Sequence, residues 1–204
     1  MQKIKNIIFD LGGIFIEIYF SKTEEAFKSL GVLNWSQFYT QSTASALFEN
    51  LKTGKITPEG FYEGFRKESG VDLTDEQIKE AWNAMLGPFP LERLQWLQEI
   101  GKRYLIYLFS NTNLIHYIAF QKIFRESMGE KNFDDYFIKT HYSHQLGIRK
   151  PYASAYKKLL QIEKLKPEET LFIDDTAKNI EGAKQAGLQT ILLLPPKTVL
   201  DLDL

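Results

Sequence analysis

The stretch Phe9–Ile14, FDLGGI, decides the fold because it closes the first apolar run of the chain. The run from Lys5 ends in the carboxylate of Asp10, and Gly12 and Gly13 follow almost at once. Short apolar runs closed by turn residues are typical of buried strands in a parallel sheet. The two glycines allow a tight turn and a close approach of the main chain. We therefore predict a strand that delivers a carboxylate to a glycine turn.

Three further apolar runs follow the same design, and helical patterns separate them. The runs are 104–110 (YLIYLFS), 171–174 (LFID) and 189–194 (QTILLL). The expected helices are 113–125, with Leu114, Ile118 and Phe124 on its apolar face, 151–162, opened by Pro151, and 178–186, closed by Gly187. Alternating strands and helices predict an α/β fold, a Rossmann-like parallel-sheet core with right-handed crossovers.

Residues 18–88 interrupt this alternation with amphipathic helices expected at 23–30, 35–51, 61–69 and 75–86. Thr57-Pro58 and the pair Thr74 and Gln77 mark two helix starts. We predict an inserted α-helical cap at 18–88 and a discontinuous core of 1–17 and 89–204. Apolar aromatic residues at helical spacing are expected to form the core of the cap, and three near its start are candidates for a substrate entrance. The first set is Trp35, Phe38, Phe61 and Trp82, and the second is Phe15, Tyr19 and Phe20.

The composition excludes several classes of protein. The 204 residues contain no cysteine, which excludes disulfides, thiolate catalysis and zinc–thiolate sites. The net charge of −1 gives no basic surplus for binding nucleic acid or an anionic membrane. The N-terminal apolar segment is too short for a signal peptide, and no apolar run approaches the length of a bilayer span. We expect a soluble cytoplasmic protein; the sequence leaves its oligomeric state open.

Polar residues at the ends of the predicted strands are expected to form one site. The carboxyl ends of parallel strands meet at one edge, where ligands bind, so Asp10, Ser110 and the pair Asp174-Asp175 should converge. Proline keeps the preceding residue extended and opens the next helix, which places Lys150 at the same crevice. This set suits a phosphate: a carboxylate nucleophile, carboxylates for Mg²⁺, hydrogen-bond donors from Ser110-Asn111 and a lysine charge.

Four motifs in this order resemble the haloacid dehalogenase superfamily of phosphatases. They are FDLGG (9–13), SNT (110–112), GIRKP (147–151) and FIDDTAKN (172–179). Each motif alone is weak, but together they cover the whole core, and LKTGKITPEGF (51–61) resembles the helical cap of that superfamily. The resemblance implies a Mg²⁺-dependent hydrolase of small, sugar-phosphate-like monoesters that acts through an aspartyl-phosphate.

The resemblance also implies a role for each matched residue. Asp10 is the nucleophile and a metal ligand, and the main-chain carbonyl of Gly12 is a second ligand. The remaining residues hold the phosphate or the metal: Ser110, Asn111 and Lys150 the phosphate, Asp174 and Asp175 the Mg²⁺, with Asn179 supporting the metal or the lysine.

Gly12 departs from the superfamily pattern. Most phosphatases of the superfamily have an aspartate two residues after the nucleophile, which protonates the leaving alcohol and then activates water. Losing such a group typically costs a factor of about 10²–10⁴ in rate. Water, the substrate or another residue, with Glu17 as a candidate, could replace it, or the protein is a poor catalyst.

Two rival functions stay open. The first is a metal-independent haloacid dehalogenase, which the acidic pair Asp174-Asp175 disfavours. The second is a catalytically weak protein that binds a phosphate ligand, which Gly12 favours. A serine nucleophile at Ser110 is disfavoured because the stretch lacks G-x-S-x-G, and a dinucleotide fold because FDLGGI lacks G-x-G-x-x-G.

Two other polar pairs receive simpler interpretations. His141 and His144 have no evident third metal ligand and are expected to be ordinary loop or surface histidines. Asp134-Asp135 precedes a strand instead of following one, so we expect a solvated turn there.

Overall fold

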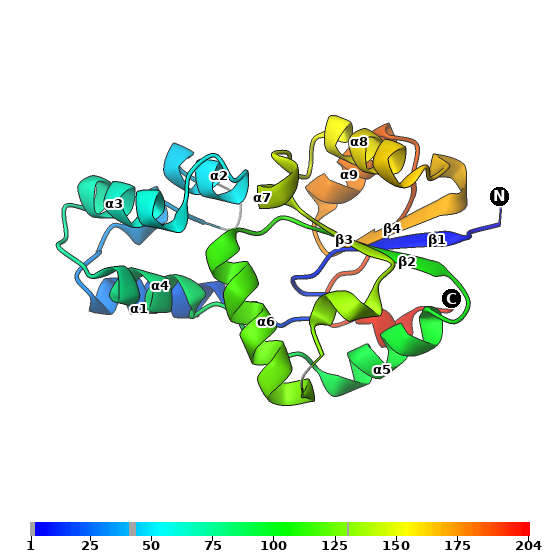
Figure 1. The fold of residues 1–204 in the computed structure, drawn as a ribbon, viewed down its shortest axis with the longest axis horizontal. Coiled ribbons are helices and arrows are strands. Elements are labelled where there is room, and N and C mark those ends of the chain that lie inside the picture. Colours follow the sequence, from blue (N-terminus) through cyan, green and yellow to red (C-terminus); the bar gives the residue numbers. More distant parts are fainter. Residues whose placement is uncertain (1–2, 41–43, 130) are drawn as a thin grey trace.

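The computed structural model describes residues 3–40, 44–129 and 131–204, and these form two lobes (Figure 1). The larger lobe contains a five-stranded sheet in the order β3-β2-β1-β4-β5, and every pairing is parallel. The strands are β1 (Asn6–Phe9), β2 (Leu105–Ser110), β3 (Lys139–Tyr142), β4 (Thr170–Asp174) and β5 (Gln189–Leu192). The predicted α/β fold with a parallel-sheet core is confirmed.

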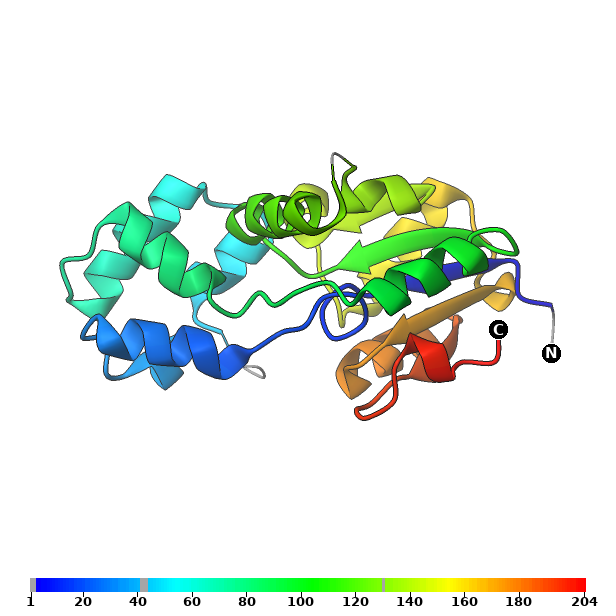
Figure 2. The same cartoon turned by 90° about the horizontal axis from the view of Figure 1, so that it is seen from below.

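Helices cover both faces of the sheet (Figures 1 and 2). Helices α8 (Ala153–Glu163) and α9 (Ala177–Gln185) lie on one face, and α5 (Leu91–Ile100) and α6 (Leu114–Met128) on the other. Alternate residues of the central strand serve the two faces: Ile8 faces α8 and α9, while Ile7 and Phe9 face the other layer. Each fully buried side chain of this kind stabilises the fold by about 1.5–3 kcal/mol.

Short helical elements make up most of the remaining connections of the larger lobe. They are η2 (Phe133–Tyr136), α7 (Ser143–Leu146), η3 (Pro167–Glu169) and η4 (Val199–Asp201). No helix in the described ranges is long and apolar enough to cross a membrane.

Two details of the predicted helices of the larger lobe are wrong. Leu114 and Ile118 do not form the buried face of α6, because they are 40% and 59% exposed, whereas Ile115 and Phe124 are buried. Helix α8 begins at Ala153, with Pro151 in the turn before it. Proline therefore does not open this helix, and Lys150 owes its position to tertiary contacts described below.

The smaller lobe consists of helices from the inserted segment. These are α1 (Phe20–Ser29), η1 (Trp35–Gln37), α2 (Ala46–Lys52), α3 (Pro58–Ser69) and α4 (Asp75–Asn83). The expected single helix over 35–51 is wrong: the segment contains η1 and the separate α2, and residues 41–43 lie outside the described part. Both predicted helix starts are present, since Thr57 accepts from the Gly60 N–H and Thr74 forms a capping box with Gln77.

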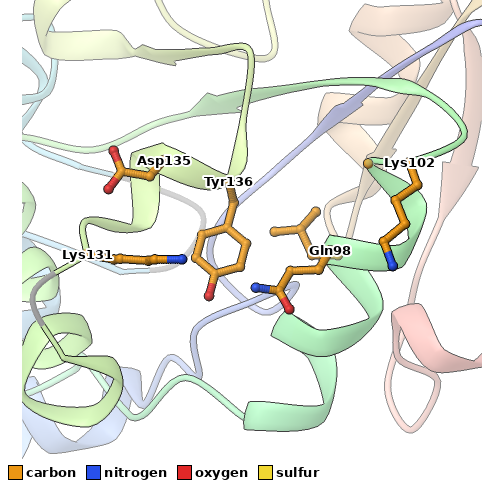
Figure 3. A pocket seen from close by; sticks show the side chains of 7 residues that line it. Gln98, Lys102, Lys131, Asp135 and Tyr136 are labelled. Atoms are coloured by element: carbon orange, nitrogen blue, oxygen red, sulfur yellow. The ribbon is translucent and has the colours of Figure 1, made fainter.

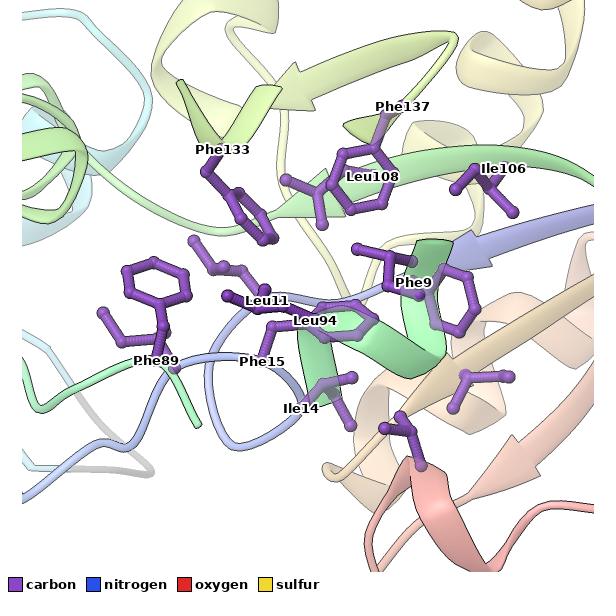
Figure 4. Close-up of a cluster of buried hydrophobic side chains, with 14 of the residues drawn as sticks. Phe9, Leu11, Ile14, Phe15, Phe89, Leu94, Ile106, Leu108, Phe133 and Phe137 are labelled. Atoms are coloured by element: carbon purple, nitrogen blue, oxygen red, sulfur yellow. The ribbon is translucent and has the colours of Figure 1, made fainter. Parts of the chain in front are cut away.

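The smaller lobe has its own aromatic core. The four predicted core aromatics, Trp35, Phe38, Phe61 and Trp82, are all buried. Phe15, by contrast, is fully buried in the larger lobe, where it packs edge-to-face on Phe9 (Figure 4). Phe15 therefore cannot line a substrate entrance, while Tyr19 and Phe20 are half-buried.

Two crossing segments tie the lobes together. Tyr19 N–H donates to Met85 O (2.8 Å), and the N–H of Gly87 donates to Glu17 O (2.8 Å). We propose that residues 18–88 form the cap and that 1–17 with 89–204 form the core domain. The two crossing segments connect these domains.

The lobes also touch on two sides away from the crossing segments. On one side His116 of α6 stacks on Trp82 of α4, with ring centroids 4.4 Å apart, and its Nε2 lies 3.0 Å from Trp82 O. On the other side Arg149 pairs with Glu49 of α2 at 2.6 Å. The smaller lobe is thus held against the larger one by an aromatic contact and by an ion pair.

Candidate active site

The register of the sheet brings the predicted strand-end residues to one edge. Phe9 pairs with both Leu108 and Ile173. Asp10 follows Phe9 and Asp174 follows Ile173, so the two acids lie side by side at the carboxyl ends of β1 and β4. The Asp10 N–H continues the ladder by donating to Ile173 O at 2.9 Å. Ser110 is the last residue of β2 and is buried. The edge therefore presents carboxylates from β1 and β4 beside a hydroxyl from β2.

Lys150 completes this group from the connection between α7 and α8. Its side chain is 1% exposed, and its Nζ donates to Asp174 Oδ2 at 2.6 Å and lies 2.8 Å from Asp10 Oδ1. Burial by itself lowers the pKa of Lys150, but the carboxylates of Asp10 and Asp174 more than offset this and raise the pKa. Lys150 is therefore a fixed positive charge between two strand-end carboxylates.

The two acids of the pair Asp174-Asp175 have different surroundings. Asp174 is fully buried and accepts from Lys150, from the Thr176 N–H (2.8 Å) and from Asn179 Nδ2 (3.0 Å to each oxygen). Asp175 is half-buried and accepts from Thr176 Oγ1 at 3.0 Å. Asp174 thus holds the lysine and Asn179 in place, while Asp175 is less occupied by protein donors.

Three carboxylates form a group that fits a divalent cation. One oxygen each from Asp10, Asp174 and Asp175 lie within 4.8 Å of one another. Burial, and then the neighbouring acids, raise the pKa of Asp10 to about 7 against the opposing effect of Lys150, and burial followed by Asp174 raises the pKa of Asp175. One lysine does not balance the charge of these three acids. Hard oxygen donors with excess negative charge are the ligands that Mg²⁺ prefers.

The two glycines after Asp10 serve different purposes. Gly13 has a φ of +73°, in the left-handed region, and a Cβ there would lie 2.2 Å from Asp175 Oδ2. Gly12 does not adopt a left-handed φ, and a Cβ there would meet the flexible side chain of Ile18 at 3.2 Å. The chain requires glycine at position 13, whereas position 12 could carry a side chain if Ile18 moved slightly.

The side-chain amide of Asn111 has a role that the sequence did not reveal. Its Nδ2 donates to Lys150 O at 2.9 Å, and the Lys150 N–H donates to its Oδ1 at 2.9 Å. The expectation that Asn111 contacts phosphate stays a prediction, but its amide is engaged with the lysine main chain. No sequence signal points to this contact between residues 39 positions apart.

Glu17 is engaged elsewhere in the structure. Its carboxylate pairs with Arg93 at 2.7 Å, and Arg93 also donates to the carbonyls of Gly13 and Ile14. These contacts favour a structural role for Glu17, which fixes the turn after Asp10, over the proton-transfer role considered from the sequence. Arg93 is a residue that the sequence reasoning missed.

Two interpretations of polar pairs need correction. His141 is neither a loop nor a surface residue, because it is buried in β3 and its Nε2 lies 2.9 Å from Glu163 Oε1. Asp135 is exposed as expected, but Asp134 is half-buried and accepts from Tyr117, Gln121 and Tyr142. Asp134 is therefore a structural acceptor that ties α6 to β3.

One cavity of the larger lobe lies apart from these residues. A space of about 360 Å³ opens between α5 and the region of η2, and polar side chains surround it (Figure 3). The lining residues are Leu97, Gln98, Gly101, Lys102, Lys131, Asp135 and Tyr136. None of them belongs to the predicted site.

The sequence and the fold agree on the family. The model of the haloacid dehalogenase-like hydrolases matches residues 4–187, and the chain belongs to this family. Among curated relatives, a D-ribitol-5-phosphate phosphatase of Bacteroides thetaiotaomicron is 31% identical over 189 residues, which covers 92% of this chain and 90% of that protein. The resemblance to the haloacid dehalogenase superfamily that the four motifs indicated is confirmed.

Solved structures give the same result. A haloacid dehalogenase family enzyme of B. thetaiotaomicron, a variant in complex with magnesium and inorganic phosphate, matches with a TM-score of 0.90 and 32% identity, covering 95% of this chain and 96% of that one. A predicted hydrolase of the family from Porphyromonas gingivalis matches with a TM-score of 0.85 and 29% identity, covering 94% and 91%. An L-2-haloacid dehalogenase at 19% identity and a TM-score of 0.60, covering 95% and 86%, shares the fold.

Proposed function

We propose that the chain is a Mg²⁺-dependent phosphatase of small phosphate monoesters of the sugar-phosphate type. The observation that carries this proposal is the group of Asp10, Asp174 and Asp175, two of which contact the buried Lys150, because it suits a divalent cation and a phosphate together. The curated relative that acts on D-ribitol 5-phosphate and the related structure with magnesium and inorganic phosphate support the same assignment.

In the proposed reaction the carboxylate of Asp10 attacks phosphorus in line and forms an aspartyl-phosphate, while the bond from phosphorus to the ester oxygen breaks and that oxygen takes a proton from water to leave as the alcohol. Lys150 places its charge beside the equatorial oxygens, and Ser110 donates a hydrogen bond to one of them. Water then hydrolyses the acyl-phosphate and regenerates the carboxylate. Burial raises the pKa of Asp10 to about 7, so a bound cation would favour the ionised form of the nucleophile at neutral pH.

The metal would be held by Asp10, Asp175 and the main-chain carbonyl of Gly12, and it would supply charge neutralisation for the incoming phosphate. Asp174 is also within reach of the cation. Its hydrogen bonds from Lys150, Thr176 and Asn179 favour a role in holding those groups. Asn179 in turn fixes the orientation of the Asp174 carboxylate.

A phosphate-release screen tests the proposal. The panel contains D-ribitol 5-phosphate, other sugar phosphates, nucleotides and phospho-acids, each with Mg²⁺ and with EDTA. We expect turnover of at least one sugar or polyol phosphate that EDTA abolishes, and an acid-quenched phosphoenzyme on Asp10. Chloride release from a 2-haloacid in EDTA would support a dehalogenase instead. Tight Mg²⁺-dependent binding of an ester without turnover would identify a binding protein, the alternative that Gly12 favours.

A further inference from the structure

The main chain of Lys150 lies in an irregular connection, where no regular secondary structure fixes its position. Lys150 belongs to a turn between α7 and α8, outside any helix or strand. Its side chain has four rotatable bonds, yet its Nζ must lie between Asp10 and Asp174. Neither a strand ladder nor a helix fixes the starting point of that side chain, so other contacts must do so.

Asn111 supplies two of these contacts. Its amide accepts from the N–H and donates to the carbonyl of the same residue, Lys150, each at 2.9 Å. Two hydrogen bonds between one planar amide and one residue restrict both the position and the orientation of that residue. Asn111 follows Ser110 directly, so the loop that begins at the end of β2 fixes the main-chain position of Lys150.

Two other contacts involve the main chain of Lys150 and of Pro151. Arg149 Nη1 donates to Lys150 O at 3.2 Å. Helix α9 approaches so closely that a Cβ on Gly182 would lie 1.8 Å from Pro151 O. The first contact comes from the neighbouring residue, and the second limits the following one. Among these contacts, those of Asn111 alone join Lys150 to the end of β2.

We propose that Asn111 is a positioning residue, whose side-chain amide fixes the main chain of Lys150 and thereby the contact of Lys150 Nζ with Asp10. This inference rests on the proposed function for its kinetic consequence. It differs from the expectation that Asn111 binds phosphate, because here the amide acts on the substrate only through the lysine. Misplacing a catalytic group by about 1 Å can cost about 10²-fold in rate.

The test compares Asn111→Ala, Lys150→Met and the double variant. On a substrate from the screen, Asn111→Ala is expected to lower kcat about 10- to 100-fold, with a smaller change in KM. Binding of inorganic phosphate with Mg²⁺ is measured by calorimetry. In the Lys150→Met background, Asn111→Ala should change the phosphate Kd less than about twofold, because the two residues act as one unit. The proposal is wrong if the phosphate Kd of the double variant rises by the product of the two single-variant factors. It is also wrong if Asn111→Ala keeps the wild-type kcat.

Asn6→Ala is the matched control. Asn6 is a buried asparagine, whereas Asn111 is half-buried, and the Asn6 amide donates two hydrogen bonds, to Glu169 O and Thr170 Oγ1, at the opposite end of β1 from Asp10. A similar loss of Tm in both variants, with kcat lowered only by Asn111→Ala, separates positioning from stability. Asn111→Ser, a milder change, serves if Asn111→Ala does not fold.

A crystal structure of the Asn111 variant tests the proposal independently of turnover. We expect Lys150 Nζ beyond hydrogen-bond distance of Asp10, with the sheet unchanged. If the wild-type chain shows neither phosphatase activity nor phosphate binding, the proposed function fails, and this displacement alone decides the role of Asn111. An unmoved lysine contradicts that role.

Discussion

Lys150 Nζ lies 2.8 Å from Asp10 Oδ1 although the two residues are 140 positions apart in the chain, and it donates to Asp174 at 2.6 Å. The lysine therefore connects the ends of β1 and β4 and fixes the carboxylate that we propose as the nucleophile. A charge placed in this way is already oriented before a phosphate arrives, so little reorganisation is needed during the reaction.

Asp10→Asn should abolish turnover, because an amide cannot form an acyl-phosphate. The variant preserves the shape of the side chain and can still accept from Lys150. We expect a loss of at least about 10³-fold in phosphate release, with no phosphoenzyme after acid quench. Retention of the wild-type rate in a preparation free of deamidated protein would falsify the assignment of Asp10 as nucleophile.

Gly12→Asp should raise the rate for esters with poor leaving groups. It restores an acid where the superfamily usually has one, and the position tolerates a Cβ if Ile18 moves. We expect at least about a tenfold gain in kcat for an alkyl phosphate and little change for 4-nitrophenyl phosphate, whose leaving group needs no proton. Gly12→Ala controls for crowding of Ile18. A rate for the alkyl phosphate that is unchanged from the wild type would show that the acid is supplied elsewhere or that the added side chain is misplaced.

Gly13→Ala should destabilise the fold and weaken Mg²⁺ binding, whereas Gly12→Ala should not. An L-residue in the left-handed region costs about 1–2 kcal/mol, and the new Cβ collides with Asp175 Oδ2. We expect a lower Tm and an increase of at least about tenfold in the Mg²⁺ concentration needed for half-maximal activity. Titration of both alanine variants with Mg²⁺ checks this difference. Equal Mg²⁺ requirements in the two variants would mean that Asp175 does not hold the metal.

His116 should make the free energy of unfolding depend on pH. Burial, with a smaller contribution from Lys52, lowers the pKa of His116 to about 3 despite the contact with Trp82 O. The unfolded chain takes up this proton near pH 6.5 and the folded chain does not, so stability is lost as the pH falls below 6.5. Between pH 7 and pH 5 this residue should cost about 2 kcal/mol.

Urea unfolding of the wild type and of His116→Phe at pH 7 and pH 5 measures that cost. Phenylalanine keeps a ring on Trp82 but has no proton to bind. The variant should lose about 2 kcal/mol less than the wild type over this interval, whatever its stability at pH 7. Equal losses would indicate that His116 is protonated in the folded protein.

The sequence predicts the strands that carry the site because their apolar runs are short and end in polar residues. The segments around Asp10, Ser110 and Asp174 were all recognisable in this way. The helix over 35–51 was wrong, because Trp35 in the short helix η1 and Phe38 in the turn after it are both buried at a spacing that resembles that of a long helix. In that segment, a buried aromatic residue does not indicate that the chain is helical.

The site residues that the sequence did not reveal act through tertiary contacts. Asn111 reaches Lys150, and Arg93 reaches Glu17 and the turn after Asp10. Local patterns report which residues share a strand or a helix face, but they contain nothing about which side chain meets which distant main chain. His141 was misjudged for a related reason, since its burial in β3 and its contact with Glu163 both depend on tertiary packing.

The buried Ile115 at the start of α6 limits how the smaller lobe could be transferred between members of this family. Ile115 comes from the larger lobe but packs among the aromatic side chains of the smaller one, beside the stack of His116 on Trp82. A graft of residues 18–88 onto another scaffold would leave a hole where this isoleucine belongs. Transplanting the lobe as a working module therefore requires the first turn of α6 to travel with it, and substitutions at Ile115 and its cap neighbours should have changed together during divergence.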